Sequence, residues 1–133
     1  MREFKFRAWL KAKKEIQNVD FMDFRFTKIG LDNEEYLKEF SNCELMQFTG
    51  LKDKNGVEIF EGDIVKFEVD EPLNKDGEKR IMFASIDFDR GSFWLNTKKR
   101  FYDGEHYTAE TLLSNFVSVC EVIGNIFEDK ELL

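Results

Sequence analysis

The sequence is poor in residues that define specialised protein classes: its 133 residues include one proline, two cysteines and one histidine. With a single proline, the chain must turn mainly at glycine, asparagine and aspartate. The two cysteines, Cys43 and Cys120, are too few for a disulfide framework. We therefore expect two free thiols in a protein of the reducing cytoplasm.

Long apolar runs are also missing. No stretch approaches the ~18 consecutive apolar residues that a membrane-spanning helix needs. Charges at Arg2, Glu3 and Lys5 interrupt the first residues, so no signal peptide is expected. The sequence therefore predicts a cytoplasmic protein with no membrane partner.

Catalytic and metal-binding motifs are absent as well. There is no HExxH, CxxC or EF-hand pattern, no P-loop and no glycine-rich dinucleotide fingerprint. The only histidine, His106, leaves open a dyad with Cys43 or Cys120, although Cys120 alternates into a predicted strand and is expected in the core. Carboxylates are scattered without metal-ligand spacing, at Glu61, Asp63, Asp87, Asp89 and Asp103. We expect no enzyme activity, no cofactor and no metal.

Positive charge is in deficit: the formal net charge is -7 and the pI is about 4.9. Non-specific binding to DNA or RNA needs a basic surface, so a nucleic-acid partner is not expected. The charge is uneven, because residues 1–28 hold 8 basic against 4 acidic residues and the remainder holds 12 against 23. This asymmetry fits internal complementarity, a contact between subunits, or a solvated face of alternating charges.

Phenylalanine is abundant, with 15 copies, which is typical of a β-rich fold with an aromatic core. Apolar and polar residues alternate over residues 2–9 and again over 20–28, which predicts two strands paired as a hairpin. Residues 32–42 are predicted as a short helix, because Asp32 can cap its first N–H groups. The expected apolar face of this helix consists of Tyr36, Leu37 and Phe40.

Turn signals are densest in the middle of the chain. Strands are predicted at 44–49, 57–60 and 64–69, with turns at Asn55-Gly56 and Gly62-Asp63 between them. In the third of these strands Val65, Phe67 and Val69 are expected to face the core. The next predicted elements are a polar loop at 71–78, strands at 80–89 and 92–96, a loop at 97–105, a short helix at 108–116 and a strand at 117–127. The strand at 80–89 is expected to carry Met82, Ala84, Ile86 and Phe88 on one face. We interpret Gly62-Asp63 as a structural turn and Gly124-Asn125 as a bulge or close backbone approach, with ligand binding as the alternative for both.

Three segments resemble the YopX family, whose members are small proteins encoded mostly by bacteriophages and prophages. They are residues 4–9 (FKFRAW), residues 49–56 (TGLKDKNG) with 61–65 (EGDIV), and residues 121–128 (EVIGNIFE). Leu10 departs from the family pattern, in which an acidic residue commonly follows the tryptophan, and Asp129-Lys130 replaces an Asn-Pro-like pair. The C-terminal part of the family is similar to SH3-type barrels, and the resemblance implies no biochemical activity.

The predicted fold is mainly β. Residues 44–133 are expected to form an SH3-like small β-barrel, in agreement with the close turns and the aromatic core. Residues 1–43 are expected to form an N-terminal β-hairpin and a short helix packed on the barrel, in one structural unit overall.

The resulting functional prediction is a phage or prophage accessory protein that acts through protein–protein contacts, with an unknown phage or host partner. The alternative is a nucleic-acid-associated factor, because a basic and aromatic cluster can grip phosphates and stack bases. That cluster consists of Lys98, Lys99, Arg100, Phe101 and Tyr102. Self-association is also predicted, through addition of the N-terminal strand to the sheet edge of a neighbour by Phe4, Phe6 and Trp9.

Overall fold

The computed structural model describes residues 3–70, 77, 79–102 and 105–133, with the backbone alone at 69–70, 98–102 and 105–111. The chain divides into two compact units, Met1–Gly50 and Leu51–Leu133, and its described part is mainly β. Within the described part, no helix is long and apolar enough to pass through a membrane.

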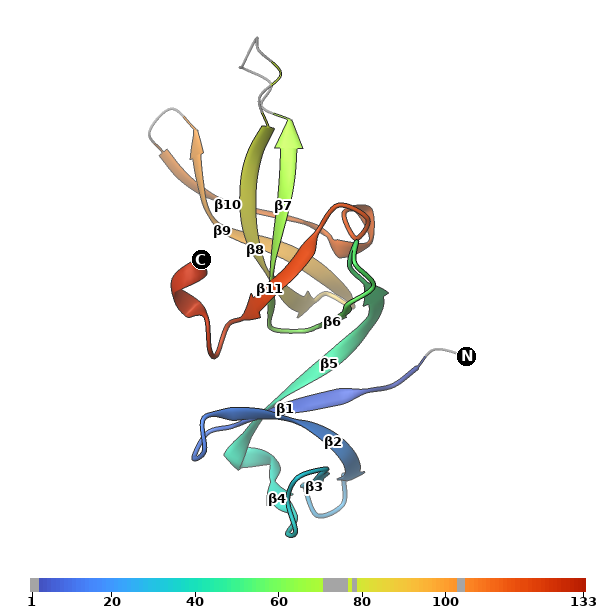
Figure 1. Cartoon of the computed structure of the whole chain (residues 1–133). Helices are drawn as coiled ribbons and strands as arrows, with labels where there is room; N and C mark the ends of the chain where they lie inside the picture. The colour runs from blue at the N-terminus through green and yellow to red at the C-terminus, as the bar shows by residue number, and fades with distance from the viewer. Residues whose placement is uncertain (1–2, 71–76, 78, 103–104) are drawn as a thin grey trace. The chain divides into compact units, whose positions relative to one another are not determined.

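The first unit is an antiparallel sheet with the strand order β4-β3-β2-β1-β5. Its strands are β1 (Phe6–Leu10), β2 (Glu15–Asp23), β3 (Lys28–Leu31), β4 (Lys38–Glu39) and β5 (Cys43–Lys52), the last of which continues past Gly50. Figure 1 shows β1 and β2 side by side in blue. The buried core of this unit is made of Ala8, Leu10, Ile29, Leu31 and Cys43.

The predicted hairpin is confirmed, but its second strand begins at Glu15 rather than Asp20, and Leu10 pairs with Glu15 next to the turn. The predicted helix over residues 32–42 is wrong. That stretch contains β4 and the 3-10 turn η1 (Phe40–Asn42). Phe40 packs against the core, whereas Tyr36 and Leu37 are 74% and 53% exposed, so the apolar helix face does not exist.

The division between the units falls at Gly50, not at Cys43, because the first half of β5 pairs with β1 from Cys43 to Gln47. The half of β5 that is hydrogen-bonded to the N-terminal hairpin belongs to that hairpin's sheet. The prediction that the N-terminal part packs on a barrel stays a prediction.

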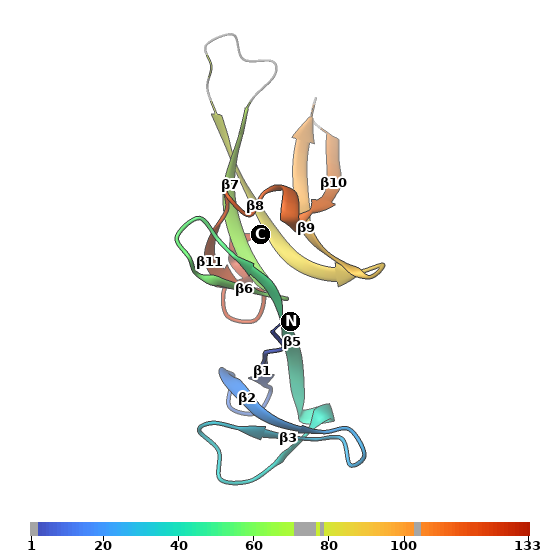
Figure 2. The same ribbon diagram turned by 90° about the vertical axis from the view of Figure 1, so that its right-hand side faces the viewer.

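The second unit is a five-stranded antiparallel sheet with the order β10-β9-β8-β7-β11, and β6 pairs with β5. The strands are β6 (Glu58–Phe60), β7 (Asp63–Asp70), β8 (Lys79–Asp89), β9 (Ser92–Tyr102), β10 (Glu105–Leu112) and β11 (Glu121–Asn125). The 3-10 turns are η2 (Leu113–Asn115) and η3 (Lys130–Leu132). Figure 2 shows β7 and β8 twisting around one another over much of their length.

Most turns and strands of this unit are confirmed, and the exceptions lie in its C-terminal half. The predicted loop at 97–105 is the end of β9 and the start of β10, and the predicted helix at 108–116 is the rest of β10 followed by η2. The last strand is limited to Glu121–Asn125. The predicted 71–78 loop falls on residues 71–76 and 78, outside the described residues.

The core of the second unit confirms the predicted alternation along β7 and β8. Val65 and Phe67 of β7 are buried together with Met82, Ala84 and Ile86 of β8. Phe88, predicted on the same face, is 51% exposed because it lies at the end of β8, next to the turn. The described strands form two antiparallel sheets and close no barrel among themselves, so the SH3-like assignment stays a prediction.

Candidate interaction groove

A buried carboxylate fixes the turn between β5 and β6. Asp53 Oδ1 accepts the N–H groups of Asn55 and Val57 at 2.8 and 2.9 Å, and Oδ2 accepts that of Val122 in β11 at 2.9 Å. Burial raises the pKa of the Asp53 carboxyl, but these three donors outweigh it and leave the pKa below its ordinary value. The side chain therefore ties together strands that are far apart in sequence.

The Gly62-Asp63 turn has the structural role predicted for it. Gly62 has a φ of +84°, which a glycine adopts without steric cost. The buried Asp63 carboxylate accepts the N–H of Phe60 at 2.8 Å, and the Gly62 N–H donates to the Ile86 carbonyl at 2.8 Å. These bonds tie the start of β7 to the end of β6 and to β8.

The Gly124-Asn125 prediction is also confirmed. The β11–β7 register shifts between Val122 and Gly124, as a bulge requires. A Cβ on Gly124 would lie 2.9 Å from the Cβ of Asp129, so the close approach comes from the chain's own C-terminal segment. The Asn125 side-chain oxygen accepts the N–H groups of Phe127 and Glu128 and holds that segment in place.

With these elements fixed, a groove forms in the second unit. Lys66 lies opposite Phe83, and Glu68 lies opposite Ile81, across β7 and β8. Because their neighbours in the two strands face the core, these four side chains belong to the outer face. The groove has a volume of about 330 Å³ and is lined by Lys54, Lys66, Phe67, Glu68, Lys79, Ile81, Ser118 and Val119.

Exposed apolar side chains lie in and beside this groove. Ile81 is 52% exposed and Phe83 is 39% exposed, two positions apart on one face of β8. Val119, in the segment between η2 and β11, is 46% exposed and also lines the groove. A single exposed apolar residue is normal, whereas several around one concave surface are typical of an interaction site.

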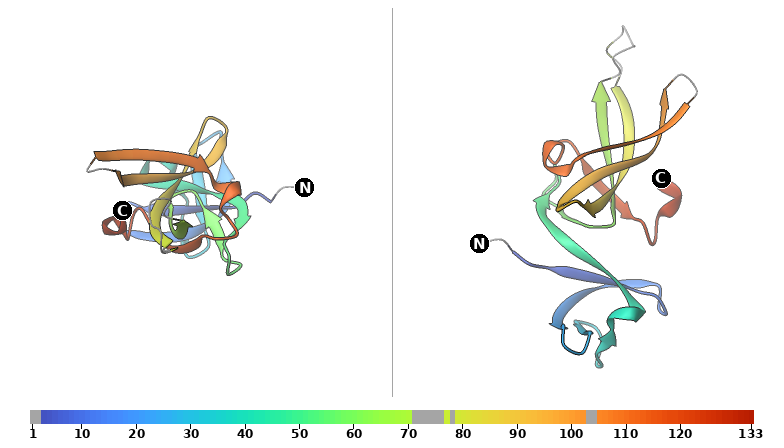
Figure 3. Two further views of the ribbon diagram at one scale, coloured as in Figure 1. Left: turned by 90° about the horizontal axis from the view of Figure 1, so that it is seen from above. Right: turned by 180° about the vertical axis from the view of Figure 1, so that it is seen from behind.

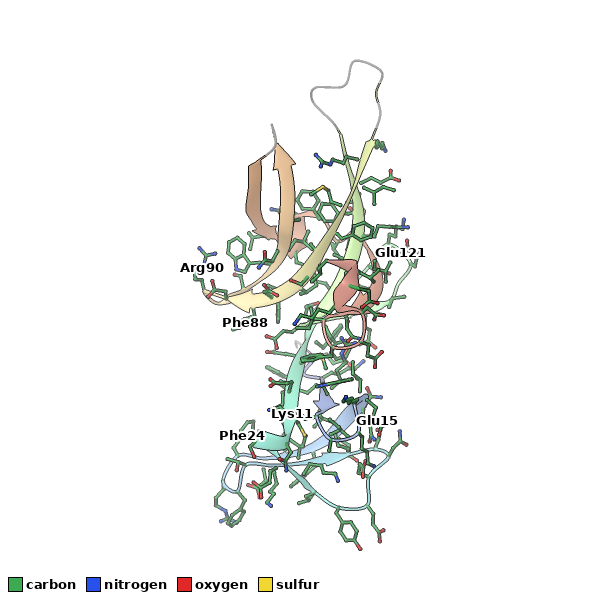
Figure 4. All side chains as sticks on the ribbon, turned by 90° about the vertical axis from the view of Figure 1, so that its left-hand side faces the viewer. Lys11, Glu15, Phe24, Phe88, Arg90 and Glu121 are labelled. Carbon is green, nitrogen blue, oxygen red and sulfur yellow. The ribbon has the colours of Figure 1, made fainter. Side chains whose placement is uncertain are left out.

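Three lysines edge the groove and share two carboxylates. Lys54 and Lys66 both contact Glu121, at 3.8 and 3.7 Å, and Lys79 contacts Glu68 at 3.7 Å. Figure 4 labels Glu121 on β11. Exposed ion pairs of this length contribute little, so an incoming carboxylate can replace them at small cost. The three lysines and these two carboxylates together carry one excess positive charge, in a chain of net charge -7.

The predicted basic and aromatic cluster lies in a hairpin rather than a loop. Arg100, Phe101 and Tyr102 of β9 pair with residues of β10, while Lys98 and Lys99 complete the same strand. Figure 3 shows this hairpin in orange. The side chains of these five residues are outside the described part, and their nucleic-acid role stays a prediction.

The residues predicted for self-association lie in or beside a central strand. Phe4 precedes β1 and is 64% exposed, whereas Phe6 and Trp9 are half-buried within it. Because β1 pairs with β2 on one side and β5 on the other, Phe6–Leu10 offers no free edge to a neighbour. Edge addition through β1 is therefore wrong as a mechanism, and homo-oligomerisation itself stays a prediction.

The remaining candidate residues form no centre within the described part. Cys43 and Cys120 are free, as predicted, and both are buried, which raises the pKa of each thiol. The side chain of His106 lies outside the described part. No group of three or more potential metal ligands occurs among the described residues. Asp87 accepts hydrogen bonds from Ser85 and Asn96, and Asp89 pairs with Arg90.

The groove was missed by the sequence reasoning, although its signal was present. The predicted alternation of β8 places Met82 and Ala84 in the core. The residues on the opposite face of the strand were not interpreted. That face carries Ile81 and Phe83, where a solvated strand face would be polar. Apolar residues on both faces of one strand indicate either a covered face or a binding surface.

Comparison with known proteins finds a matching family model and a similar solved structure. A family model described as YopX protein matches residues 5–133. The crystal structure of protein EF1440 from Enterococcus faecalis is similar, with a TM-score of 0.62 and 32% sequence identity over 100% of this chain and 99% of that chain. A search of curated proteins found no match.

Proposed function

The chain belongs to the YopX family, and we propose that it is a non-enzymatic protein–protein interaction module. The observation that carries the proposal is the groove over β7 and β8, where Ile81 and Val119 are exposed between lysines. Its partner is a protein segment that carries both apolar side chains and carboxylates. Such a segment buries the apolar residues and satisfies the excess positive charge together.

The proposal also includes the biological setting that the resemblance to the YopX family implies. The module is a phage or prophage accessory protein acting in the host cytoplasm, and its partner is a phage or host protein. The fold of the second unit is a variant of the SH3-type small barrel. Support comes from its antiparallel strands, its tight turns at Gly56 and Gly62, and its single apolar core.

An affinity pull-down from host cells tests the proposal with a matched pair of variants. Ile81→Asp places a carboxylate in the groove, while Phe88→Asp places one on the same strand at a similar exposure outside it. We expect a protein that is recovered by the unmodified chain and by Phe88→Asp, but lost with Ile81→Asp. Recovery should fall as salt is raised, because the lysine contacts are screened.

The fold of each variant is checked by its denaturation midpoint, which should change little at an exposed site. If no recovered protein depends on Ile81, the groove is not the interaction site. If the groove-dependent ligand is an oligonucleotide rather than a protein, the alternative function through a nucleic acid replaces this proposal.

A further inference from the structure

A second concave site lies in the first unit and shares no lining residue with the groove. It has a volume of about 320 Å³, and its walls come from the β1–β2 turn, β4, η1 and the start of β5. Its lining residues are Leu10, Lys11, Ala12, Lys13, Lys38, Asn42 and Cys43. Figure 4 labels Lys11 at this turn. The volume is within the range of pockets that hold small ligands, roughly 300–1,000 Å³.

The floor of this pocket is apolar. Leu10 and Cys43 face each other as cross-strand partners in β1 and β5, and they are 4% and 6% exposed. Burial raises the pKa of the Cys43 thiol even though Lys38 and Lys11 lower it, so the thiol is uncharged at neutral pH. An uncharged sulfur beside a leucine offers a surface for the apolar body of a ligand.

The rim of the pocket is cationic. The lining holds three lysines, and none of its described residues is acidic, in a chain with a net charge of -7. The carboxylates that pair with these lysines are not among the lining residues. Lys13 and Lys38 both pair with Glu34, the latter at 3.6 Å, and Lys11 pairs with Glu44 at 3.3 Å.

Three carboxylates act on these lysines: Glu34 and Glu44 form ion pairs with them, and Glu15 acts on Lys13 through its charge. Lys11 also donates a hydrogen bond to the Ser41 carbonyl at 3.1 Å. The pKa of Glu34 is lowered, chiefly by its hydrogen bond with Lys13, so this carboxylate stays charged. The lysine heads are 33–51% exposed and sit on flexible stems, so they can reorient toward an anion.

We infer that this pocket binds a small organic anion, with a carboxylate, phosphate or sulfonate group held by Lys11, Lys13 and Lys38 and an apolar body against Leu10 and Cys43. The side-chain amide of Asn42 supplies a neutral donor beside the lysines. Divalent cations are poor ligands for this rim because its side-chain charges are positive. The site is independent of the groove, so this inference and the proposed function stand or fall separately.

The test compares two probes that differ in charge, 8-anilinonaphthalene-1-sulfonate and the uncharged N-phenyl-1-naphthylamine, in fluorescence titrations of the full chain. We expect the sulfonate to bind saturably and to shift the backbone NMR signals of residues 10–13 and 43. The double variant Lys13→Gln/Lys38→Gln should weaken it by about five- to tenfold, the loss of two exposed charge contacts. It should leave the affinity of the uncharged probe unchanged.

Two further variants serve as controls. Lys13→Arg/Lys38→Arg keeps the charge and should retain most of the affinity for the sulfonate. Lys66→Gln/Lys79→Gln removes lysines from the groove and should have no effect. The inference is overturned if the glutamine variant binds the sulfonate normally, if both probes bind equally, or if the NMR shifts lie at the groove.

Discussion

At the scale of single residues, Asp53 shows how main-chain donors stabilise a carboxylate that is shielded from water. Three N–H groups converge on it from the β5–β6 turn and from β11. A hydrogen bond to a charged group typically contributes about 1.5–3 kcal/mol, more than a neutral one. Because its pKa is lowered on folding, Asp53 stabilises the protein above its unfolded pKa of about 3.9, and this contribution is lost as the pH falls through the folded value.

We therefore predict that Asp53→Asn lowers the free energy of unfolding by about 1–3 kcal/mol at pH 7, because an amide is uncharged and must turn an N–H toward a donor. The deficit should shrink as the pH falls below 4 and then through the lowered pKa of the folded state, where Asp53 in the original protein also becomes protonated. Urea denaturation of both proteins at pH 7 and below pH 4 measures this difference in the free energy of unfolding. Asp89→Asn, which removes an exposed ion pair with Arg90, is the control and should change stability by less than about 0.5 kcal/mol. A pH-independent deficit would contradict this account.

The two thiols provide a second residue-scale prediction. Cys43 lines a pocket, whereas Cys120 is fully buried in the core of the second unit. We expect mass spectrometry to find both thiols free without reduction, and native alkylation to modify Cys43 well before Cys120. Unfolding should make the two rates similar. A disulfide mass, or faster modification of Cys120, would contradict the assignment of these positions.

At the scale of elements, the register of β7 decides which side chains reach the core. Phe67 is 5% exposed, and its ring centroid lies 5.6 Å from that of Phe116, while its neighbours Lys66 and Glu68 line the groove on the outer face. A one-residue shift would exchange the two faces. The groove therefore depends on the same register as the core.

Phe67→Ala should lower the free energy of unfolding by roughly 3–5 kcal/mol, the usual cost of truncating a buried aromatic side chain. The measurement is chemical denaturation followed by Trp94 fluorescence in a Trp9→Phe background, so that the signal comes from the second unit. Lys66→Ala, one position along the strand, is the matched control and should have a small effect. An unchanged midpoint for Phe67→Ala would mean that the strand register is wrong.

The elements predictable from the sequence were those with a local physical signature. Asn55-Gly56 and Gly62-Asp63 specify turns by their backbone preferences, and alternation specifies β7 and β8. The two predicted helices failed because i,i+4 apolar spacing also occurs in short, irregular strands. Leu113 illustrates this: it is fully buried, as a core residue of the predicted helix would be, but it is placed there by η2.

The candidate sites were less predictable than the fold. The groove needs residues from the β5–β6 turn, β7, β8 and the segment before β11, and the pocket needs residues from 10 to 43. No local motif encodes such assemblies, because pairing between distant strands brings the lysines together. In the sequence, only the apolar residues on both faces of β8 indicated one of these sites, the groove.

At the scale of the whole molecule, the chain has a separate apolar core in each unit. Trp9 belongs to the first unit and Trp94 to the second, so each unit carries one fluorescent reporter. Coincident denaturation curves from the two single-tryptophan proteins would indicate one cooperative transition, and separate curves would indicate two. This distinction decides whether the Asp53 and Phe67 effects extend to the first unit.

Self-association is the prediction that concerns the whole chain. Residues 1–28 are basic in balance and the remainder is strongly acidic, so contact between copies can bring opposite charges together. Since β1 is paired on both sides, truncating residues 1–9 would remove a central strand and damage the first unit itself. The exposed Phe4, which precedes β1, allows a milder test.

We expect sedimentation at micromolar concentration to show a species heavier than the 15.8 kDa monomer, and Phe4→Asp to reduce it while the denaturation midpoint is maintained. Raising the salt concentration should also weaken association if charge asymmetry drives it. Phe88→Asp, an exposed aromatic site in the other unit, is the control and should leave the oligomer intact. A monomer at all concentrations would mean that the basic part of one copy does not bind the acidic part of another. The lysines of residues 1–28 would then be explained by their own ion pairs, such as Lys13 with Glu34 and Lys28 with Glu39.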